Sequence, residues 1–340
     1  MKQKIVGYGE LLLRLSPAAQ GSLIEQSELL QMSFAGAEAN IIADLALLGH
    51  QTGFITALPE NPLGRKANQF LQGYGVETNS VIWDKARLGS YYIEHGSSIR
   101  GTRVTYDRAD SSITKNKISD KDWESLFKNV SHFILTGVTP ALSQICRDNI
   151  QAALEIAKSK NVKVVFDLNY RRSLWEKEEA RKSFESILPY VNILIANTGS
   201  AFDVFGIESP AITNYETAKS STQTVTNALN NLGNFVWIAM TIRLQNNADD
   251  NELGGMIKNG KDYFFSNSIK TTIIDRLGGG DAFAAAAIHG IIKGWPANEI
   301  INFATAAFAL TQTIHGDINY LSEQEIMSTA SGDTQGHVKR

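Results

Sequence analysis

Short apolar runs alternate along the chain with segments whose apolar residues recur every three or four positions. Apolar runs of strand length predict β-strands that are buried on both faces. They lie at 5–15, 132–136, 162–168, 191–196, 235–241 and 269–275. The segments with helical spacing lie at 37–48, 62–73, 119–130, 141–160, 176–187, 217–232, 280–293 and 297–313. This alternation predicts an α/β fold, with a mostly parallel central sheet that carries helices on both faces.

Two segments depart from this pattern, at about 11–33 and 81–107. Their polar and apolar residues alternate, as in Ser90–His95 and Thr102–Tyr106, which is typical of strands with one polar face. We expect a small second sheet that acts as a lid, because a lid excludes water from the chemistry beneath it. An antiparallel extension of the main sheet is the alternative. The remaining organisation is one domain over 1–330, followed by a polar, flexible tail at 331–340.

Composition and charge argue against several classes of function. Of the 340 residues, 43% are hydrophobic and 20% are charged, which is ordinary for a chain with a large buried core. The net charge of -3 gives no electrostatic reason to expect nucleic acid or an anionic membrane as a partner. The single cysteine, Cys146, has no partner for an intramolecular disulfide, and no apolar stretch approaches the ~18 residues of a membrane span. We therefore expect a cytoplasmic protein.

The most informative motif lies within Ile273–Phe283, where Gly278, Gly279 and Gly280 precede Asp281 at the start of a predicted helix. Consecutive glycines let backbone N–H groups converge on one point, and the helix N-terminus adds its positive end. Such a loop is suited to bind a phosphoryl group in transfer. Asp281 is then placed to accept the proton of an attacking hydroxyl. The alternative is an aspartate that caps the helix after a flexible turn.

A second segment of small residues, Ala35–Asn40, begins the first predicted helix. Gly36 permits close approach of a hydroxylated ligand to the backbone. Asn40 lies one turn later on the same face, where its amide both donates and accepts hydrogen bonds. Tight helix packing through small residues is the alternative explanation.

One further motif is misleading. Gly255–Lys261 has the spacing of a P-loop, but Asp262 stands where Ser or Thr would bind magnesium. An Asn-Gly pair at 259–260 between two strand-like segments is typical of a hairpin turn. We expect a β-hairpin here and no nucleotide loop.

The glycine run before Asp281 and the segment Ala35–Asn40 resemble motifs of the ribokinase (PfkB) family of carbohydrate kinases. The resemblance covers nearly the whole chain and includes Gly9–Glu10, Phe34–Asn40, Asn197 and Gly278–Asp281 in this order, with Gly279 where the family usually has alanine. It implies a ribokinase-like fold, with ATP and Mg²⁺ as cofactors. It also implies that Asp281 is the catalytic base and that the three glycine amides form the anion hole. A monovalent cation is left open as a further activator.

Three segments resemble the 2-keto-3-deoxygluconate kinases within that family, namely Gly36–Asn40, Leu135–Ser143 and Phe166–Trp175. By position, this resemblance implies that the sugar acid is bound by Gly36, Asn40, Tyr91, Tyr106, Arg108 and Arg171. The chemistry agrees, because a guanidinium suits a carboxylate and tyrosine hydroxyls suit sugar oxygens. The alternative for Arg108 and Arg171 is an ordinary surface arginine with an acidic partner, and Arg171 is equally suited to a phosphate.

The nucleotide side departs from the family pattern in two places. The family usually carries Asn-x-x-Glu where this chain has Asn197–Ser200, and a serine supplies no negative charge for a hard cation. The metal ligands therefore stay unassigned. A Thr-x-Arg, Thr241 to Arg243, stands where many relatives have a glycine-containing nucleotide loop. We expect Asn169, Asn197, Thr241 and Arg243 to bind the nucleotide; a structural arginine in a surface insertion is the alternative for Arg243.

The polar stretch that follows predicts a flexible loop at 246–251 beside the nucleotide. Its acidic neighbours, Asp249, Asp250 and Glu252, are candidates to replace the missing glutamate. The loss of the glutamate, or its replacement by one of these carboxylates, would decide how strongly the site holds a metal.

The resulting prediction is an ATP-dependent kinase that converts 2-keto-3-deoxy-D-gluconate to its 6-phosphate. One alternative is a kinase of the same fold for another sugar, such as fructose or a nucleoside. The other is a sugar-acid-binding protein whose phosphoryl transfer is weakened by Ser200. The expected partners are small molecules, without nucleic acid or membrane, and the half-polar lid strands predict a homodimer or a higher homo-oligomer.

Overall fold

The computed structural model describes residues 4–19, 21–334 and 336. Ten of the strands in these residues form one sheet, in the order β13-β12-β11-β10-β9-β8-β1-β4-β5, with β14 paired to β12. Every pairing from β5 to β11 is parallel, and β12, β13 and β14 are antiparallel additions. The bounds are β1 Lys4–Tyr8, β4 Thr52–Pro59, β5 Val81–Asp84, β8 Val130–Thr136, β9 Lys163–Asp167, β10 Val191–Ala196, β11 Trp237–Gln245, β12 Asp250–Asn259, β13 Asp262–Phe265 and β14 Ile269–Thr272.

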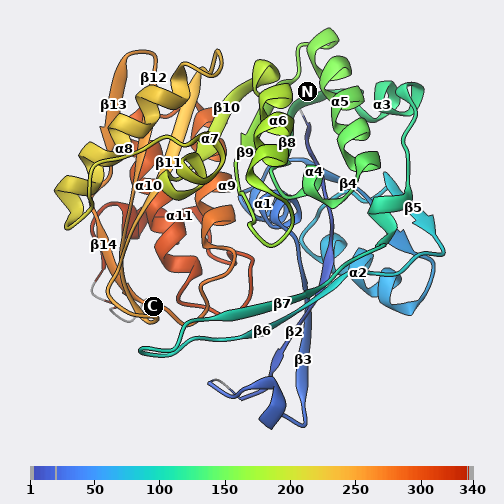
Figure 1. Ribbon diagram of the computed structural model, residues 1–340, viewed down its shortest axis with the longest axis horizontal. Coiled ribbons are helices and arrows are strands. Elements are labelled where there is room, and N and C mark those ends of the chain that lie inside the picture. The colour runs from blue at the N-terminus through green and yellow to red at the C-terminus, as the bar shows by residue number, and fades with distance from the viewer. Residues whose placement is uncertain (1–3, 20, 335, 337–340) are drawn as a thin grey trace.

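Helices cover both faces of this sheet (Figure 1). One core contains residues of α1, α2, α9, α10 and α11, and the other contains residues of α3, α5, α6, α7 and α8. The bounds are α1 Ala37–Leu47, α2 Pro62–Gly73, α3 Asp120–Leu126, α4 Thr139–Leu142, α5 Gln144–Ser159, α6 Lys177–Ile187, α7 Thr198–Phe205, α8 Tyr215–Asn230, α9 Gly279–Lys293, α10 Ala297–Thr311 and α11 Glu323–Ala330. The predicted fold class is confirmed.

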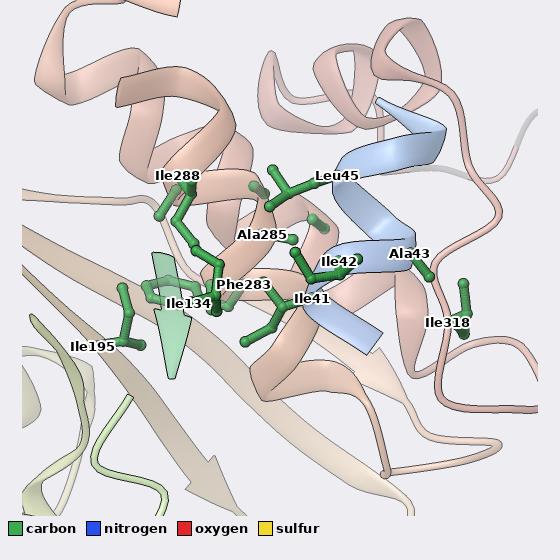
Figure 2. Packing of buried hydrophobic residues seen from close by; sticks show 14 of the residues in the cluster. Ile41, Ile42, Ala43, Leu45, Ile134, Ile195, Phe283, Ala285, Ile288 and Ile318 are labelled. Atoms are coloured by element: carbon green, nitrogen blue, oxygen red, sulfur yellow. The ribbon is translucent and has the colours of Figure 1, made fainter. Parts of the chain in front are cut away.

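Alternate residues of the central strands enter opposite cores, which explains their continuous apolar runs. Ile134 packs into the first core, whereas its neighbours Phe133 and Leu135 pack into the second. In the first core, Ile41, Ile42 and Leu45 of α1 lie beside α9, as Figure 2 shows. This packing of α1 against α9 brings the two predicted site motifs together.

A separate sheet has the strand order β3-β2-β6-β7 within the described part of the chain. Its strands are β2 Leu12–Pro17, β3 Leu30–Ala35, β6 Ser90–Glu94 and β7 Arg103–Asp107. This small sheet lies below the main body in Figure 1, with β6 and β7 extending across its lower edge. The expectation of a second sheet is therefore right, and the alternative of an extended main sheet is wrong.

Two strand predictions need correction. The run at 5–15 is two strands in two sheets, because the chain leaves the main sheet after Tyr8 and re-enters pairing at Leu12. An unbroken apolar run does not reveal a change of sheet. The segment 81–107 likewise begins with β5, which pairs with β4 in the main sheet. The strand β4 was not predicted, although all of its residues are buried.

Several element ends also differ from the predictions. The helix expected at 141–160 is divided at Ser143, whose hydroxyl accepts the Cys146 N–H at 3.1 Å and caps α5. The expected hairpin is present as β12 and β13, with Asn259 paired to Asp262 and Gly260 at a φ of 60°. Of the expected tail, residues 335 and 337–340 lie outside the described residues. None of the described helices is long and apolar enough to cross a membrane.

Candidate active site

Asp281 lies in the first turn of α9, directly after the glycine run. Gly278 precedes the helix with a φ of 74°, and a Cβ there would overlap the backbone carbonyl of Asp317, so only glycine fits without displacement. The Asp281 carboxylate is 8% exposed and accepts a hydrogen bond of 2.7 Å from the Asn40 side-chain amide. Burial raises the pKa of Asp281 well above its ordinary value, and the Asn40 bond opposes this shift. Asn40 thus holds one carboxylate oxygen of the predicted base.

A first cavity contains every residue that was predicted to bind the sugar acid. Its lining includes Gly36, Asn40, Tyr91, Tyr106, Arg108, Arg171 and Asp281. The side formed by Leu12, Tyr91 and Tyr106 belongs to the small sheet, whereas Gly36 and Asn40 come from the start of α1. The small sheet therefore forms one side of this cavity, and its action as a lid stays a prediction.

The two predicted carboxylate-binding arginines have different surroundings. Arg108 donates from Nε to Glu10 Oε2 at 2.8 Å and forms an ion pair with the same carboxylate, which also accepts the Ser111 hydroxyl. Its guanidinium lies 5.2 Å from the centre of the Tyr106 ring. Arg171 has no carboxylate within ion-pair distance in the described structure, although its charge opposes the rise that burial causes in the pKa values of Asp167 and Asp281. Arg108 is partly buried and has an acidic partner, as its alternative supposed, so its contact with the sugar acid stays a prediction.

Four charged residues at or beside this cavity were not predicted as site residues. Glu10, Glu38 and Asp317 line it, and Arg14 forms an ion pair with Asp317. The Glu38 Oε1 atom accepts bonds from the Thr136 N–H at 3.1 Å and from the hydroxyls of Thr136 and Thr139 at 2.8 and 2.6 Å. This carboxylate therefore ties the start of α1 to the end of β8. Glu38 lies within the predicted small-residue motif, so its position in the sequence offered a signal.

Asp317 follows α10 and carried no such signal, because an isolated aspartate in a loop has no pattern around it. Its carboxylate lines the first cavity and accepts the Tyr91 hydroxyl at 3.2 Å. Arg14 forms ion pairs with both Asp317 and Asp275, and its side chain is 4% exposed. Arg14 and Tyr91 are neighbours on β2 and β6, so this cluster connects the small sheet to the core. Burial raises the pKa of Asp317, while Arg14 opposes that shift.

A second, larger cavity meets the first at Arg171, Leu277, Gly278 and Asp281. It lies at the carboxyl ends of β9, β10 and β11, where parallel α/β sheets usually bind ligands. All four predicted nucleotide-binding residues, Asn169, Asn197, Thr241 and Arg243, line it. Gly278 and Gly280 line it too, whereas Gly279 is buried beside the Gln312 side chain. The Asn197 side-chain oxygen caps α7 by accepting the Ser200 N–H at 2.8 Å.

The donor set of the second cavity suits a divalent cation. Asp167, at the end of β9, lines the cavity, and burial raises its pKa to about 7, opposed by the Asn169 N–H and by Arg171. Magnesium is commonly bound by one or two carboxylates together with substrate phosphates. Asp167 therefore fits Mg²⁺, and sequence reasoning missed it because a single aspartate at a strand end resembles a capping residue.

The acidic candidates at 249–252 do not lie at this cavity. Among these described residues, Asp249 accepts the Ser98 N–H at 2.8 Å, Asp250 accepts the Asn247 amide at 3.1 Å and Glu252 accepts the Ser268 hydroxyl. They are engaged in local contacts, so the hypothesis that they replace the missing glutamate is not supported. The expected loop at 246–251 is also shorter, because β12 begins at Asp250 and pairs Asn251 with Gln245.

Comparison with known proteins agrees with this geometry. A family model described as "pfkB family carbohydrate kinase" matches residues 2–324. The chain belongs to the PfkB family of carbohydrate kinases. A 2-dehydro-3-deoxygalactonokinase of Haloferax volcanii is 32% identical over 337 residues, which cover 99% of each chain.

Solved structures share this fold. The crystal structure of 2-dehydro-3-deoxygluconokinase from Thermotoga maritima has a TM-score of 0.92 and 37% identity, covering 97% of this chain and 100% of that one. A putative ribokinase II from E. coli, in complex with ATP and Mg²⁺, shares the fold at a TM-score of 0.79 and 20% identity, covering 97% and 99%. This PfkB chain is therefore a carbohydrate kinase, similar to kinases of 2-dehydro-3-deoxy sugar acids.

Proposed function

We propose that this PfkB kinase transfers the γ-phosphoryl group of ATP to the primary hydroxyl of 2-keto-3-deoxy-D-gluconate, giving the 6-phosphate. The observation that supports it is the position of Asp281 at the junction of the two cavities. The residues expected to bind the sugar acid line one cavity, and those expected to bind the nucleotide line the other. A hydroxyl and a phosphoryl group that enter from the two sides meet at this carboxylate.

The reaction then forms a bond between the hydroxyl oxygen and the γ-phosphorus and breaks the bond to the β-phosphate oxygen, releasing ADP. Asp281 accepts the hydroxyl proton, and its raised pKa makes it a stronger base than an exposed aspartate. Backbone N–H groups at Gly278 and Gly280 stabilise the negative charge of the phosphoryl group. Asp167 would hold Mg²⁺, which supplies charge neutralisation when bound.

An acidic substrate is favoured by Arg171. Its guanidinium lines both cavities and has no ion-pair partner among the described carboxylates, so it is available to a carboxylate of the sugar. Arg108 is already paired with Glu10 and contributes through the position of Tyr106 as well as through its charge. We expect Arg171→Gln to raise the KM for the sugar acid more than the KM for ATP.

The experiment that tests the proposal is coupled ADP release with ATP and Mg²⁺. The substrates are 2-keto-3-deoxygluconate, its galactonate epimer, ribose, fructose and adenosine. The epimer is included because the Haloferax volcanii relative is a 2-dehydro-3-deoxygalactonokinase. Turnover of a keto-deoxy acid alone supports the proposal, and preference for a neutral sugar contradicts it. Binding of the acid without turnover would favour the alternative, a sugar-acid-binding protein with weakened phosphoryl transfer. The Ser200→Glu variant is measured in parallel, and restored turnover in it would assign the loss to Ser200.

The remaining expectations stay proposals. We expect the enzyme in the cytoplasm, where ATP is available. Activity measured over a potassium titration tests the monovalent-cation activator.

We also expect a homo-oligomer that forms through the small sheet. Its edge strand β3 exposes Leu30 and Met32 at 39% and 50%, and exposed apolar edge strands are typical of association surfaces. Light scattering of the native protein beside Met32→Lys tests this.

A further inference from the structure

The nucleotide cavity carries more cationic side chains than acidic ones. Its described lining includes three arginines, Arg171, Arg243 and Arg276, but only two carboxylates, Asp167 and Asp281. Arg276 was assigned to no predicted site, although it lies within the motif Ile273–Phe283, in the loop between β14 and α9. It is two residues before Gly278, the first glycine of the anion hole.

Neither Arg243 nor Arg276 has an acidic partner in the part of the chain that the structure describes. Arg243 donates from Nη1 to the Asn251 amide oxygen at 3.3 Å, and its guanidinium lies 5.1 Å from the centre of the Phe308 ring. Arg276 donates from Nη2 to the Gln245 amide oxygen at 3.2 Å. A partly buried guanidinium normally pairs with a carboxylate or a phosphate. Amide oxygens leave the charge of both side chains uncompensated.

The two guanidiniums also act on each other. Burial and, to a smaller extent, the charge of Arg276 lower the pKa of Arg243 to about 9. Burial lowers the pKa of Arg276 as well. Two like charges at one partly buried site are unfavourable unless an anion lies between them. An anion can bind there, because the same cavity is lined by both arginines and by Gly278 and Gly280.

We infer that Arg276 and Arg243 together bind the polyphosphate of the nucleotide, with Arg276 on the side of the transferred phosphoryl group. This inference rests on the proposed nucleotide site and extends it to a residue outside the predicted set. Guanidiniums bind phosphate oxygens through parallel hydrogen bonds without needing a metal. The cavity thus neutralises part of the phosphate charge with protein groups, in a chain where Ser200 supplies no carboxylate for a metal.

The test is calorimetric binding of ATP, inorganic tripolyphosphate and adenosine to the full-length protein in EDTA, where no divalent metal contributes. Charge-assisted hydrogen bonds predict that Arg276→Gln and Arg243→Gln each weaken ATP and tripolyphosphate binding by about 10- to 100-fold. Adenosine binding is expected to be unchanged. Arg276→Met, which keeps the aliphatic stem, is measured beside the glutamine variant, and thermal unfolding identifies the variants that are folded.

Arg172→Gln is the matched control. Arg172 is adjacent to Arg171 in sequence, but it pairs with Asp203 and does not line the cavity. Its loss removes one positive charge nearby, so a change of less than about twofold excludes a general charge effect. Polyphosphate affinity that is equal in the wild type and in folded Arg276 variants would overturn the inference.

These outcomes are separable from those of the proposed function. Turnover of the keto-deoxy acid with Mg-ATP by the wild type tests the reaction, whatever Arg276 does. If the wild type shows no turnover but Arg276→Gln still weakens ATP binding in EDTA, the inference holds and the proposed reaction is rejected. If the wild type turns over the keto-deoxy acid but Arg276→Gln binds ATP as tightly as the wild type does, the reaction is supported and the inference is overturned.

Discussion

Replacing Arg14 with methionine tests the connection between the small sheet and the core. Arg14 is 4% exposed and forms ion pairs with Asp275 and Asp317, whose exposed fractions are 0% and 8%. Methionine fills part of the same volume but leaves both carboxylates without their cation. Removing one partner of a buried ion pair destabilises a protein by about 3–5 kcal/mol. We expect Arg14→Met to lower the free energy of unfolding by this amount, measured by urea denaturation followed by tryptophan fluorescence.

The loss should depend on pH, with a sign that follows from Asp317. Burial already raises the pKa of Asp317 above that of an unfolded chain, and loss of Arg14 raises it further. A carboxyl whose pKa is higher in the folded state binds its proton more tightly there, so folding is favoured at low pH and weakened as pH rises. Arg14→Met is therefore expected to lose less stability at pH 5 than at pH 8.

Arg87→Met is the control, because Arg87 pairs with Asp107 at the end of β7 and both side chains are exposed. We expect no measurable change in its unfolding. Asp317 and Tyr91 line the first cavity, so Arg14→Met should also raise the KM for the sugar acid more than the KM for ATP. A loss of stability below about 1 kcal/mol, the level of an exposed pair, would refute the view that Arg14 anchors the small sheet.

Three further predictions concern the chemistry. Asp281→Asn should lower kcat by about 10²- to 10⁴-fold while calorimetry still detects sugar-acid binding, and near-normal turnover would exclude Asp281 as the base. Asp167 has a pKa of about 7, so the Mg²⁺ concentration needed for half-maximal activity should rise as pH falls below 7, because a protonated carboxyl does not bind a cation; Asp167→Asn should abolish this dependence, and an unchanged profile counts against the assignment. Gly278→Ala should abolish turnover, because its φ of 74° and the Asp317 carbonyl exclude a Cβ; a fully active alanine variant would mean that the loop tolerates displacement.

The residues predicted to bind the sugar acid and the nucleotide all line the two cavities, whereas Gly279 of the predicted anion hole does not. The glycine run and Ala35–Asn40 are local motifs, whose conformations depend mainly on their own residues. Asp317 was missed because it is a single aspartate in a loop. Arg276 and Asp167 lie within the quoted segments Ile273–Phe283 and Phe166–Trp175, but no role was assigned to them there. Such residues become recognisable only when their neighbours in space are known.

The alternation of apolar runs by itself determined the α/β class, because a strand buried on both faces must be apolar at every position. The sequence also determined the hairpin at 259–260 and the glycine turn, since these conformations are local. Only the tertiary structure decided that the run at 5–15 divides between two sheets, that β5 joins β4, and that Arg14 meets Asp317. Apolar periodicity reports how deeply a segment is buried, but the partner of a strand or of a buried charge depends on packing between residues up to 303 positions apart.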